Sequence, residues 1–226
     1  MIVAVSSVLN EAPILRDTTM HLLNQGVDWV VISDGRSTDG TRELICELPQ
    51  TTMLTQYGPF RQDEEMTRLA QYARKMGADW VIPFDADEYW CGIADLSVVP
   101  SGYSRVYAPV FHHIDTDRRW ATPKLPKVAF RPAADMTVEW GNHNVHGLDG
   151  DSLTGPLVVR ELQYRDYDHF LSKIERAAQL YAESEFPAEY GSHLRRLVGL
   201  TDMERAAEWA TMQLVPTVHD PIPAYR

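Results

Sequence analysis

Cysteine is scarce in this sequence: 226 residues contain two, Cys46 and Cys91. Two thiols cannot build a disulfide framework, and neither has neighbours at zinc-ligand spacing. Long apolar runs are missing too, since none approaches the ~18 residues that a membrane helix needs. The first segment lacks a basic start and reaches Asn10 and Glu11 early, unlike a signal peptide. We therefore expect a soluble, cytoplasmic protein with no transmembrane segment.

Positive charge is also in short supply, with 21 Lys and Arg against 32 Asp and Glu and a formal net charge of -11. A surface of that average sign repels phosphate backbones and anionic lipid, so we expect no binding to a nucleic-acid backbone. Any phosphate-bearing ligand would need a local cation or a metal. The composition is otherwise globular, and the length suits one main domain with an appended subdomain.

Apolar patterns of two periods alternate through the first ninety residues. Strand-type runs are followed by helical stripes three times, and a fourth strand-type run closes the series. Such alternation predicts an α/β fold with a Rossmann-like, mostly parallel sheet and helices on both faces. The strand-type runs cover 2–9, 28–33, 52–57 and 79–84, and the helical stripes cover 13–26, 37–48 and 63–77.

Beyond Trp90 the pattern changes to β-type segments separated by Pro, Gly and Asp, and then to helices. The β-type segments predict antiparallel additions to the sheet or a cover over its edge. We expect helices over 167–185 and 201–214 and an extended tail over 215–226. The domain boundary predicted from this change separates residues 1–165 from a helical extension, 166–226.

The stretch DWVIPFDADEYW ends a buried strand with Asp85, Asp87 and Glu88. Alternate residues of an extended segment point the same way, so the two aspartates can aim their carboxylates at one point. Two like charges held so close are costly unless a cation or a donor network offsets them. Oxygen ligands favour Mg²⁺ or Mn²⁺, which can stabilise a departing nucleoside diphosphate. The alternative is a solvated acidic turn that caps the next element.

Two other strands deliver polar residues to the same sheet edge. SDGRSTDGT places Asp34 directly after the second strand, within reach of a nucleoside hydroxyl or base donor. LNEAP places Asn10 and Glu11 after the first strand. Residues 37–39 are also ordinary helix-cap types, so capping alone is the alternative. Ligands of open parallel sheets bind at this edge, and the coincidence of three strands is a stronger signal than any one motif.

LNEAP, SDGRSTDGT and FDADEYW, in this order and spacing, resemble the nucleotide-sugar-binding half of a GT-A fold glycosyltransferase of the family 2 type. The resemblance covers residues 1–90, with weaker similarity in GNHNV and YRDYDHFLSKI. It implies a nucleotide-sugar-binding half, 1–90, and an acceptor-binding and metal-completing half, 91–165. It also implies a hexosyltransferase-type enzyme with a UDP- or GDP-sugar donor and an acceptor that the sequence does not name. This chain departs from the family at Leu9, where many members have a basic residue, and at Arg36, where they have glycine.

The resemblance also implies roles for single residues. In that family the positions matching Asn10, Glu11 and Asp34 line the nucleoside pocket. The Asp-x-Asp matching Asp85 and Asp87 meets the ribose and the diphosphate-bound metal. A histidine from the second half often completes the metal site. His143 is therefore the candidate third ligand for Mn²⁺ or Mg²⁺, with His146 as the fallback.

Three further assignments stay open. Arg61 could neutralise a donor phosphate, or it could be a surface cation facing the acids of the next helix. An inverting transferase needs a general base, and the sequence does not choose among Glu88, Asp115 and Glu139. Three tryptophans could stack on sugar faces or fill the core. These are Trp90, Trp120 and Trp140.

Three other functions are alternatives to a glycosyltransferase. A nucleotidyltransferase would normally carry a Gly-rich, basic loop after the first strand, and VLNEAP has neither glycine nor lysine. A phosphatase with an Asp-x-Asp nucleophile would carry that motif on an early strand. A catalytically inactive nucleotide-sugar-binding module needs no acid pair, so the retained aspartates favour the enzyme.

Overall fold

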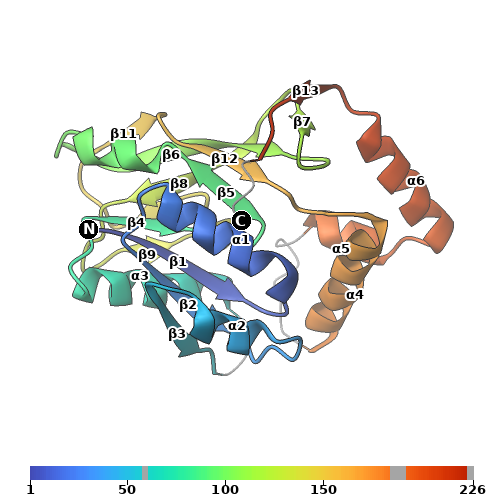
Figure 1. Cartoon of the computed structure of the whole chain (residues 1–226), viewed down its shortest axis with the longest axis horizontal. Coiled ribbons are helices and arrows are strands. Elements are labelled where there is room, and N and C mark those ends of the chain that lie inside the picture. Colours follow the sequence, from blue (N-terminus) through green and yellow to red (C-terminus); the bar gives the residue numbers. More distant parts are fainter. Residues whose placement is uncertain (58–60, 184–191, 223–226) are drawn as a thin grey trace.

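A curled, nine-stranded mixed sheet forms the centre of the computed structural model, which describes residues 1–57, 61–183 and 192–222 (Figure 1). The α/β architecture predicted from the alternating pattern is confirmed. The strands are β1 Ile2–Val8, β2 Trp29–Asp34, β3 Thr51–Thr55, β4 Trp80–Pro83, β5 Glu88–Cys91, β6 Tyr103–His112, β7 Arg118–Trp120, β8 Lys124–Phe130, β9 Thr137–Val138, β10 Val145–His146, β11 Asp151–Thr154, β12 Val158–Glu161 and β13 Thr217–His219. The helices are α1 Ala12–Asn24, α2 Thr41–Glu47, α3 Gln62–Lys75, α4 Tyr167–Glu183, α5 Ser192–Val198 and α6 Asp202–Gln213, with 3-10 turns at Ile93–Val98 and Trp140–Asn142.

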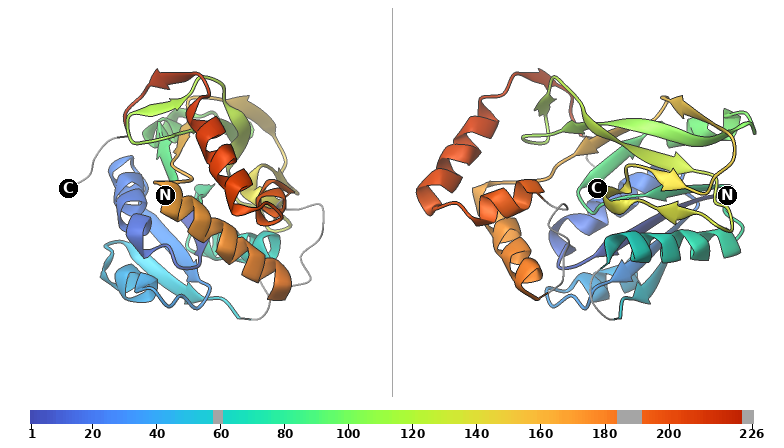
Figure 2. Two further views of the ribbon diagram at one scale, coloured as in Figure 1. Left: turned by 90° about the vertical axis from the view of Figure 1, so that its right-hand side faces the viewer. Right: turned by 180° about the vertical axis from the view of Figure 1, so that it is seen from behind.

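The first half of the sheet has the order β3-β2-β1-β4, and all three pairings are parallel. Successive residues of β1 face opposite sides: Ala4 lies in the core beneath α1 and α2, whereas Val3 and Val5 pack with α3. Figure 2 shows α1 and α3 on opposite faces of the sheet. The strand order reverses between β1 and β4, which is where open α/β sheets bind ligands.

The second half of the sheet is mixed. β8 pairs antiparallel with both β4 and β6, and β12 pairs antiparallel with β5, as expected of the additions. β11 and β12, however, run parallel to β6. β5 begins at Glu88, directly after the two aspartates, so the acids lie in a short link between two strands. The sequence pattern did not predict β5, because its apolar residues continue the preceding strand-type run.

The C-terminal helices gather at the end of the sheet towards which β1 points (Figure 1). Tyr164, Phe170, Ile174 and Leu197 form a separate apolar cluster there. The predicted tail contains β13, which pairs antiparallel with β7. α5 was not predicted, and residues 184–185 of the expected helix lie outside the described residues. Among the described helices, none is both long and apolar enough to span a bilayer.

Candidate functional site

The loops after β1 and β2 are bound together into one unit. The Asn10 amide donates to Ser37 Oγ (2.9 Å), and the Thr38 amide donates to Asn10 Oδ1 (2.8 Å). Asn10 adopts φ 57°, a left-handed conformation that asparagine tolerates better than most residues. The Glu11 amide donates to Thr41 Oγ1 (3.0 Å). These contacts fix the predicted nucleoside-binding residues at the edge of the parallel sheet.

Asp34 is fully buried and holds the second of these loops in shape. Its carboxylate accepts hydrogen bonds from the backbone amides of Arg36 (2.9 Å) and Ser37 (3.2 Å). Arg42 Nη1, on α2, lies 2.7 Å from Asp34 Oδ2. The alternative, helix capping by residues 37–39, is not what Asp34 does: α2 has Gly40 at its N-cap and no side-chain cap hydrogen bond. Arg42 was not predicted.

Helix α4 reaches across the edge to the loop after β1. Arg176 Nη1 donates to the Asn10 carbonyl (2.5 Å), and Arg176 Nη2 lies 3.6 Å from Glu11 Oε1. Burial raises the pKa of Glu11, although Lys173 opposes the shift. A helix from the predicted extension, 166–226, therefore contributes directly to the site.

Asp85 and Glu88 share a buried lysine. Lys127 Nζ, from β8, lies 2.7 Å from Asp85 Oδ2 and 2.9 Å from Glu88 Oε1. The Lys127 side chain is 6% exposed and that of Glu88 is 0% exposed. Burial raises the pKa of Glu88. Burial alone would lower the pKa of Lys127, but the two carboxylates outweigh it and the net shift is upward, so this lysine is a cation.

Asp87 is held by a second lysine, also from a distant element. Lys173 Nζ, on α4, lies 2.5 Å from Asp87 Oδ2. Burial lowers the pKa of Lys173, but Asp87 and Glu11 outweigh it and the pKa is raised overall. The Asp87 carbonyl accepts from the Leu162 amide (2.9 Å), which fastens the acidic link to the chain just after β12. Each aspartate of the predicted pair thus has its own ammonium partner.

The predicted histidine ligand lies near this group. His143 Nδ1 donates to the Pro126 carbonyl (2.8 Å), one residue before Lys127. Burial lowers the pKa of His143. Gly141, at φ 79°, lets the ring pack closely, because a Cβ there would lie 2.8 Å from His143 Cδ2. The fallback, His146, is exposed on β10.

The carboxylate oxygens that would bind a divalent ion are already paired with lysine side chains. Lys127 occupies Asp85 Oδ2, and Asn142 Nδ2 lies 3.4 Å from Asp85 Oδ1. Lys173 occupies Asp87 Oδ2. Within the described ranges, no group of three or more His, Cys, Asp and Glu side chains is placed to share an ion. The Mn²⁺ or Mg²⁺ site at Asp85, Asp87 and His143 therefore stays a prediction.

The candidates left open by the sequence lie in three different settings. Arg61 directly precedes α3, with its guanidinium 3.1 Å from Glu64 and 3.8 Å from Asp63. Asp115 pairs with Arg118 (2.7 Å) in a turn. Glu139 is exposed, and Glu88 is fully buried and paired with Lys127, so the choice of a general base stays open. Trp90 belongs to the core, Trp120 contacts His112 with ring centroids 4.4 Å apart, and Trp140 lies in a 3-10 turn.

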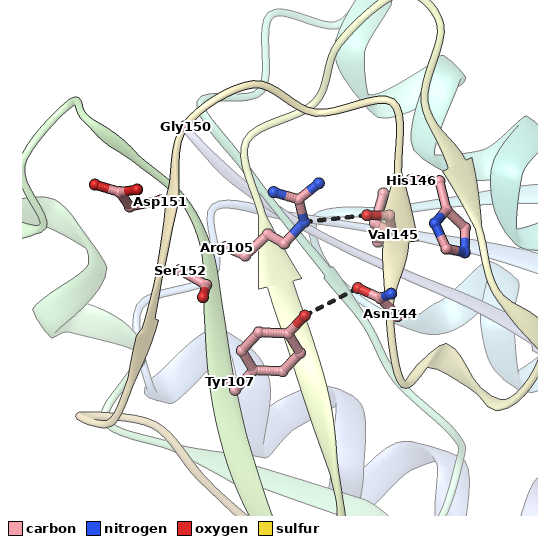
Figure 3. A pocket seen from close by; sticks show the side chains of 8 residues that line it. All are labelled: Arg105, Tyr107, Asn144, Val145, His146, Gly150, Asp151 and Ser152. Atoms are coloured by element: carbon pink, nitrogen blue, oxygen red, sulfur yellow. Dashed lines mark hydrogen bonds between the residues drawn. The ribbon is translucent and has the colours of Figure 1, made fainter.

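A cavity of about 360 Å³ lies on the second half of the sheet (Figure 3). Arg105 Nε donates to the Val145 carbonyl (3.1 Å), and the Tyr107 hydroxyl donates to Asn144 Oδ1 (2.9 Å). These polar groups therefore hydrogen-bond to other residues of the cavity lining. His146 lines this cavity, and neither aspartate of the predicted pair does. The full lining is Arg105, Tyr107, Asn144, Val145, His146, Gly150, Asp151 and Ser152.

Four basic residues of the site escaped the sequence analysis. Single lysines and arginines in β8, α2 and α4 carry no local pattern that separates them from surface cations. Two of them stand in YRDYDHFLSKIER, whose first part belongs to the weaker similarity noted in the C-terminal half. The four are Arg42, Lys127, Lys173 and Arg176.

No protein-family model and no curated protein matches the sequence, but solved structures match the fold. The structure of S. aureus TarS residues 1–349 in complex with UDP aligns over 85% of this chain and 68% of that one, at 10% identity and a TM-score of 0.52. A longer S. aureus TarS structure aligns over 92% of this chain, at 11% identity and a TM-score of 0.53. The chain spans 42% of that longer structure. The likeness supports a GT-A-like fold.

Proposed function

We propose that this protein is a glycosyltransferase that moves a sugar from a nucleoside-diphosphate donor to an acceptor hydroxyl. One observation carries the proposal. Asn10, Glu11, Asp34 and the Asp85–Asp87 pair come from the carboxyl ends of β1, β2 and β4, at the edge where the strand order of a GT-A-like sheet reverses. The loops after β1 and β2 are joined by hydrogen bonds, and α4 contacts both Asn10 and Asp87. An edge of this kind is where such folds place a nucleotide.

The reaction breaks the bond between the anomeric carbon and a diphosphate oxygen, and the electron pair leaves with the diphosphate. An acceptor oxygen forms the new bond to carbon and loses its proton. In this proposal Asn10, Glu11 and Asp34 seat the nucleoside, and Asp85 meets the ribose. The charge that develops on the departing diphosphate is stabilised by cationic groups already oriented around it. The family 2 assignment and the hexosyl character of the sugar are parts of the proposal.

UDP is the first donor fragment to test, because the TarS structure that aligns with this chain was solved with UDP. Thermal unfolding would be followed with UDP, GDP, UMP and UDP-sugars, each with EDTA and with Mn²⁺. At a ligand concentration of 100 Kd, binding to the native state adds about 2.7 kcal/mol, or about 5–10 °C in Tm for a chain of this size. We expect the nucleoside diphosphates to raise Tm more than UMP does, since UMP lacks the second phosphate.

Asp85→Asn is the matched variant, and the exposed Asp149→Asn is its control. Asp85→Asn should reduce the rise in Tm caused by UDP-sugars. It should also reduce the slow hydrolysis of UDP-sugars to UDP, whereas Asp149→Asn should change neither quantity. Pyrophosphate release from a nucleoside triphosphate and a sugar phosphate would instead support a nucleotidyltransferase. Binding without any release of UDP would support the inactive module.

A further inference from the structure

We propose that Lys173 meets the donor diphosphate, with the buried Lys127 adding to the positive charge of the site, so that donor binding needs no divalent ion. The inference rests on the proposed function and names what meets the diphosphate. It departs from the metal-dependent reading of the Asp-x-Asp motif.

The first support is the pairing of each aspartate with its own ammonium. Lys173 Nζ lies 2.5 Å from Asp87 Oδ2, and Lys127 Nζ lies 2.7 Å from Asp85 Oδ2. Carboxylates two positions apart in the chain carry like charges that need compensation when they are brought together. In a metal-dependent site one divalent ion meets that need and also bridges to the diphosphate. Here two side chains of the protein already meet it.

The second support is the donor capacity that remains. An ammonium group carries three N–H donors. Lys173 uses one on Asp87, and its side chain is 17% exposed, against 6% for Lys127. Lys127 uses one on Asp85 and lies 2.9 Å from Glu88 Oε1 in an ion pair. Lysine ammonium groups bind phosphate as compact point charges, so the remaining donors suit diphosphate oxygens.

The third support is the placement of α4. Lys173 and Arg176 are three residues apart and share one face of the helix. That face meets the loop after β1 through Arg176 and the acidic link through Lys173. A chain with net charge -11 thus concentrates two cations at the edge where an anionic donor would bind. The helix does not merely pack there, because its cations contact the predicted site residues.

The fourth support is the cost of the alternative. A divalent ion on both aspartates would displace the two ammonium groups from Oδ2 and then face them at short range. Repulsion between like charges is strong where water is excluded, and the Lys127 side chain, 6% exposed, would keep Glu88 as its remaining partner. The fold therefore favours lysine over a metal at these oxygens.

Thermal shift and calorimetry with UDP, in EDTA and in Mn²⁺, test the inference. Wild type should bind UDP equally in both. Lys173→Met should weaken UDP binding about tenfold or more, as expected for loss of a charged hydrogen bond, and should change UMP binding less. Lys173→Arg keeps the charge and should hold most of the affinity. Lys75→Met, which removes an exposed lysine at the end of α3, is the control for net charge and should leave UDP affinity unchanged.

Two further readouts separate lysine from metal. Asp87→Ala should keep or strengthen UDP binding in EDTA, because it frees Lys173. In a metal-dependent site the same substitution would abolish the UDP binding seen with Mn²⁺. The electron paramagnetic resonance signal of free Mn²⁺ in a solution that already contains UDP should not fall further when wild-type protein is added. Lys173→Met, which uncovers Asp87, should bind more Mn²⁺ than wild type does.

The opposite results are equally definite. UDP binding that requires Mn²⁺ and disappears in Asp87→Ala would overturn this inference and leave the proposed function standing. Equal loss of UDP and UMP binding in a folded Lys173→Met protein would also overturn it, since the lysine would then not act on the second phosphate. An absence of binding by any nucleoside diphosphate, with or without Mn²⁺, would overturn both.

Discussion

The nucleoside side of the site and the acidic side are assembled by contacts of different range. On the nucleoside side, Asp34 bonds to the amides two and three residues ahead, and Asn10 reaches Ser37 and Thr38 across 27 and 28 residues. On the acidic side, the lysine partners of the aspartates stand 42 and 86 residues away. The loop-to-loop contacts of the first arrangement need two neighbouring crossover units, to which Arg176 of α4 adds one contact across 166 residues. The second arrangement consists of contacts made by β8 and α4, so it depends more fully on distant elements.

The largest expected effect is on the acidic side. Lys127→Met should lower the free energy of unfolding by about 3–5 kcal/mol, because it leaves Glu88 and Asp85 without their shared buried cation. Urea unfolding followed by tryptophan fluorescence and circular dichroism would measure the loss and show whether the two probes coincide.

A double-mutant cycle makes this test specific. Adding Glu88→Gln to Lys127→Met removes the buried carboxyl group that the first change left without its cation, so part of the lost stability should return. Purely additive losses in the free energy of unfolding, or a loss below about 1 kcal/mol for Lys127→Met alone, would show that the Lys127–Glu88 pair does not stabilise the fold in this way.

The same contrast of range explains how far the sequence could lead. Alternating periods predicted β1 to β4 and α1 to α3, because helix and strand periodicities are local properties. The acids were found because each follows a strand end. Their partners Lys127 and Lys173 could not be found, since nothing beside them in the chain reveals which carboxylate they will meet. β5 and the parallel pairing of β12 with β6 likewise depend on how the sheet curls.

An intermediate effect is expected on the nucleoside side. Asp34→Ala removes the acceptor for the Arg36 and Ser37 amides and should lower the free energy of unfolding by about 1–3 kcal/mol. Asp34→Asn keeps one acceptor oxygen and should recover part of that loss. Both would be measured as a shift of the urea midpoint at unchanged slope. A loss from Asp34→Ala as large as that from Lys127→Met would erase the distinction between the two sides.

The smallest effect is expected from Arg61, which lies outside both groups of contacts. Its side chain is 48% exposed and pairs with Glu64, which is 66% exposed, so water and salt screen the attraction. Arg61→Ala should change the free energy of unfolding by no more than about 0.5 kcal/mol. In calorimetry its UDP affinity should stay within about threefold of wild type, far from the loss expected for Lys173→Met. A tenfold loss would instead make Arg61 a third cation of the donor site. The acidic side would then draw its positive charge from the N-terminal half as well as from β8 and α4.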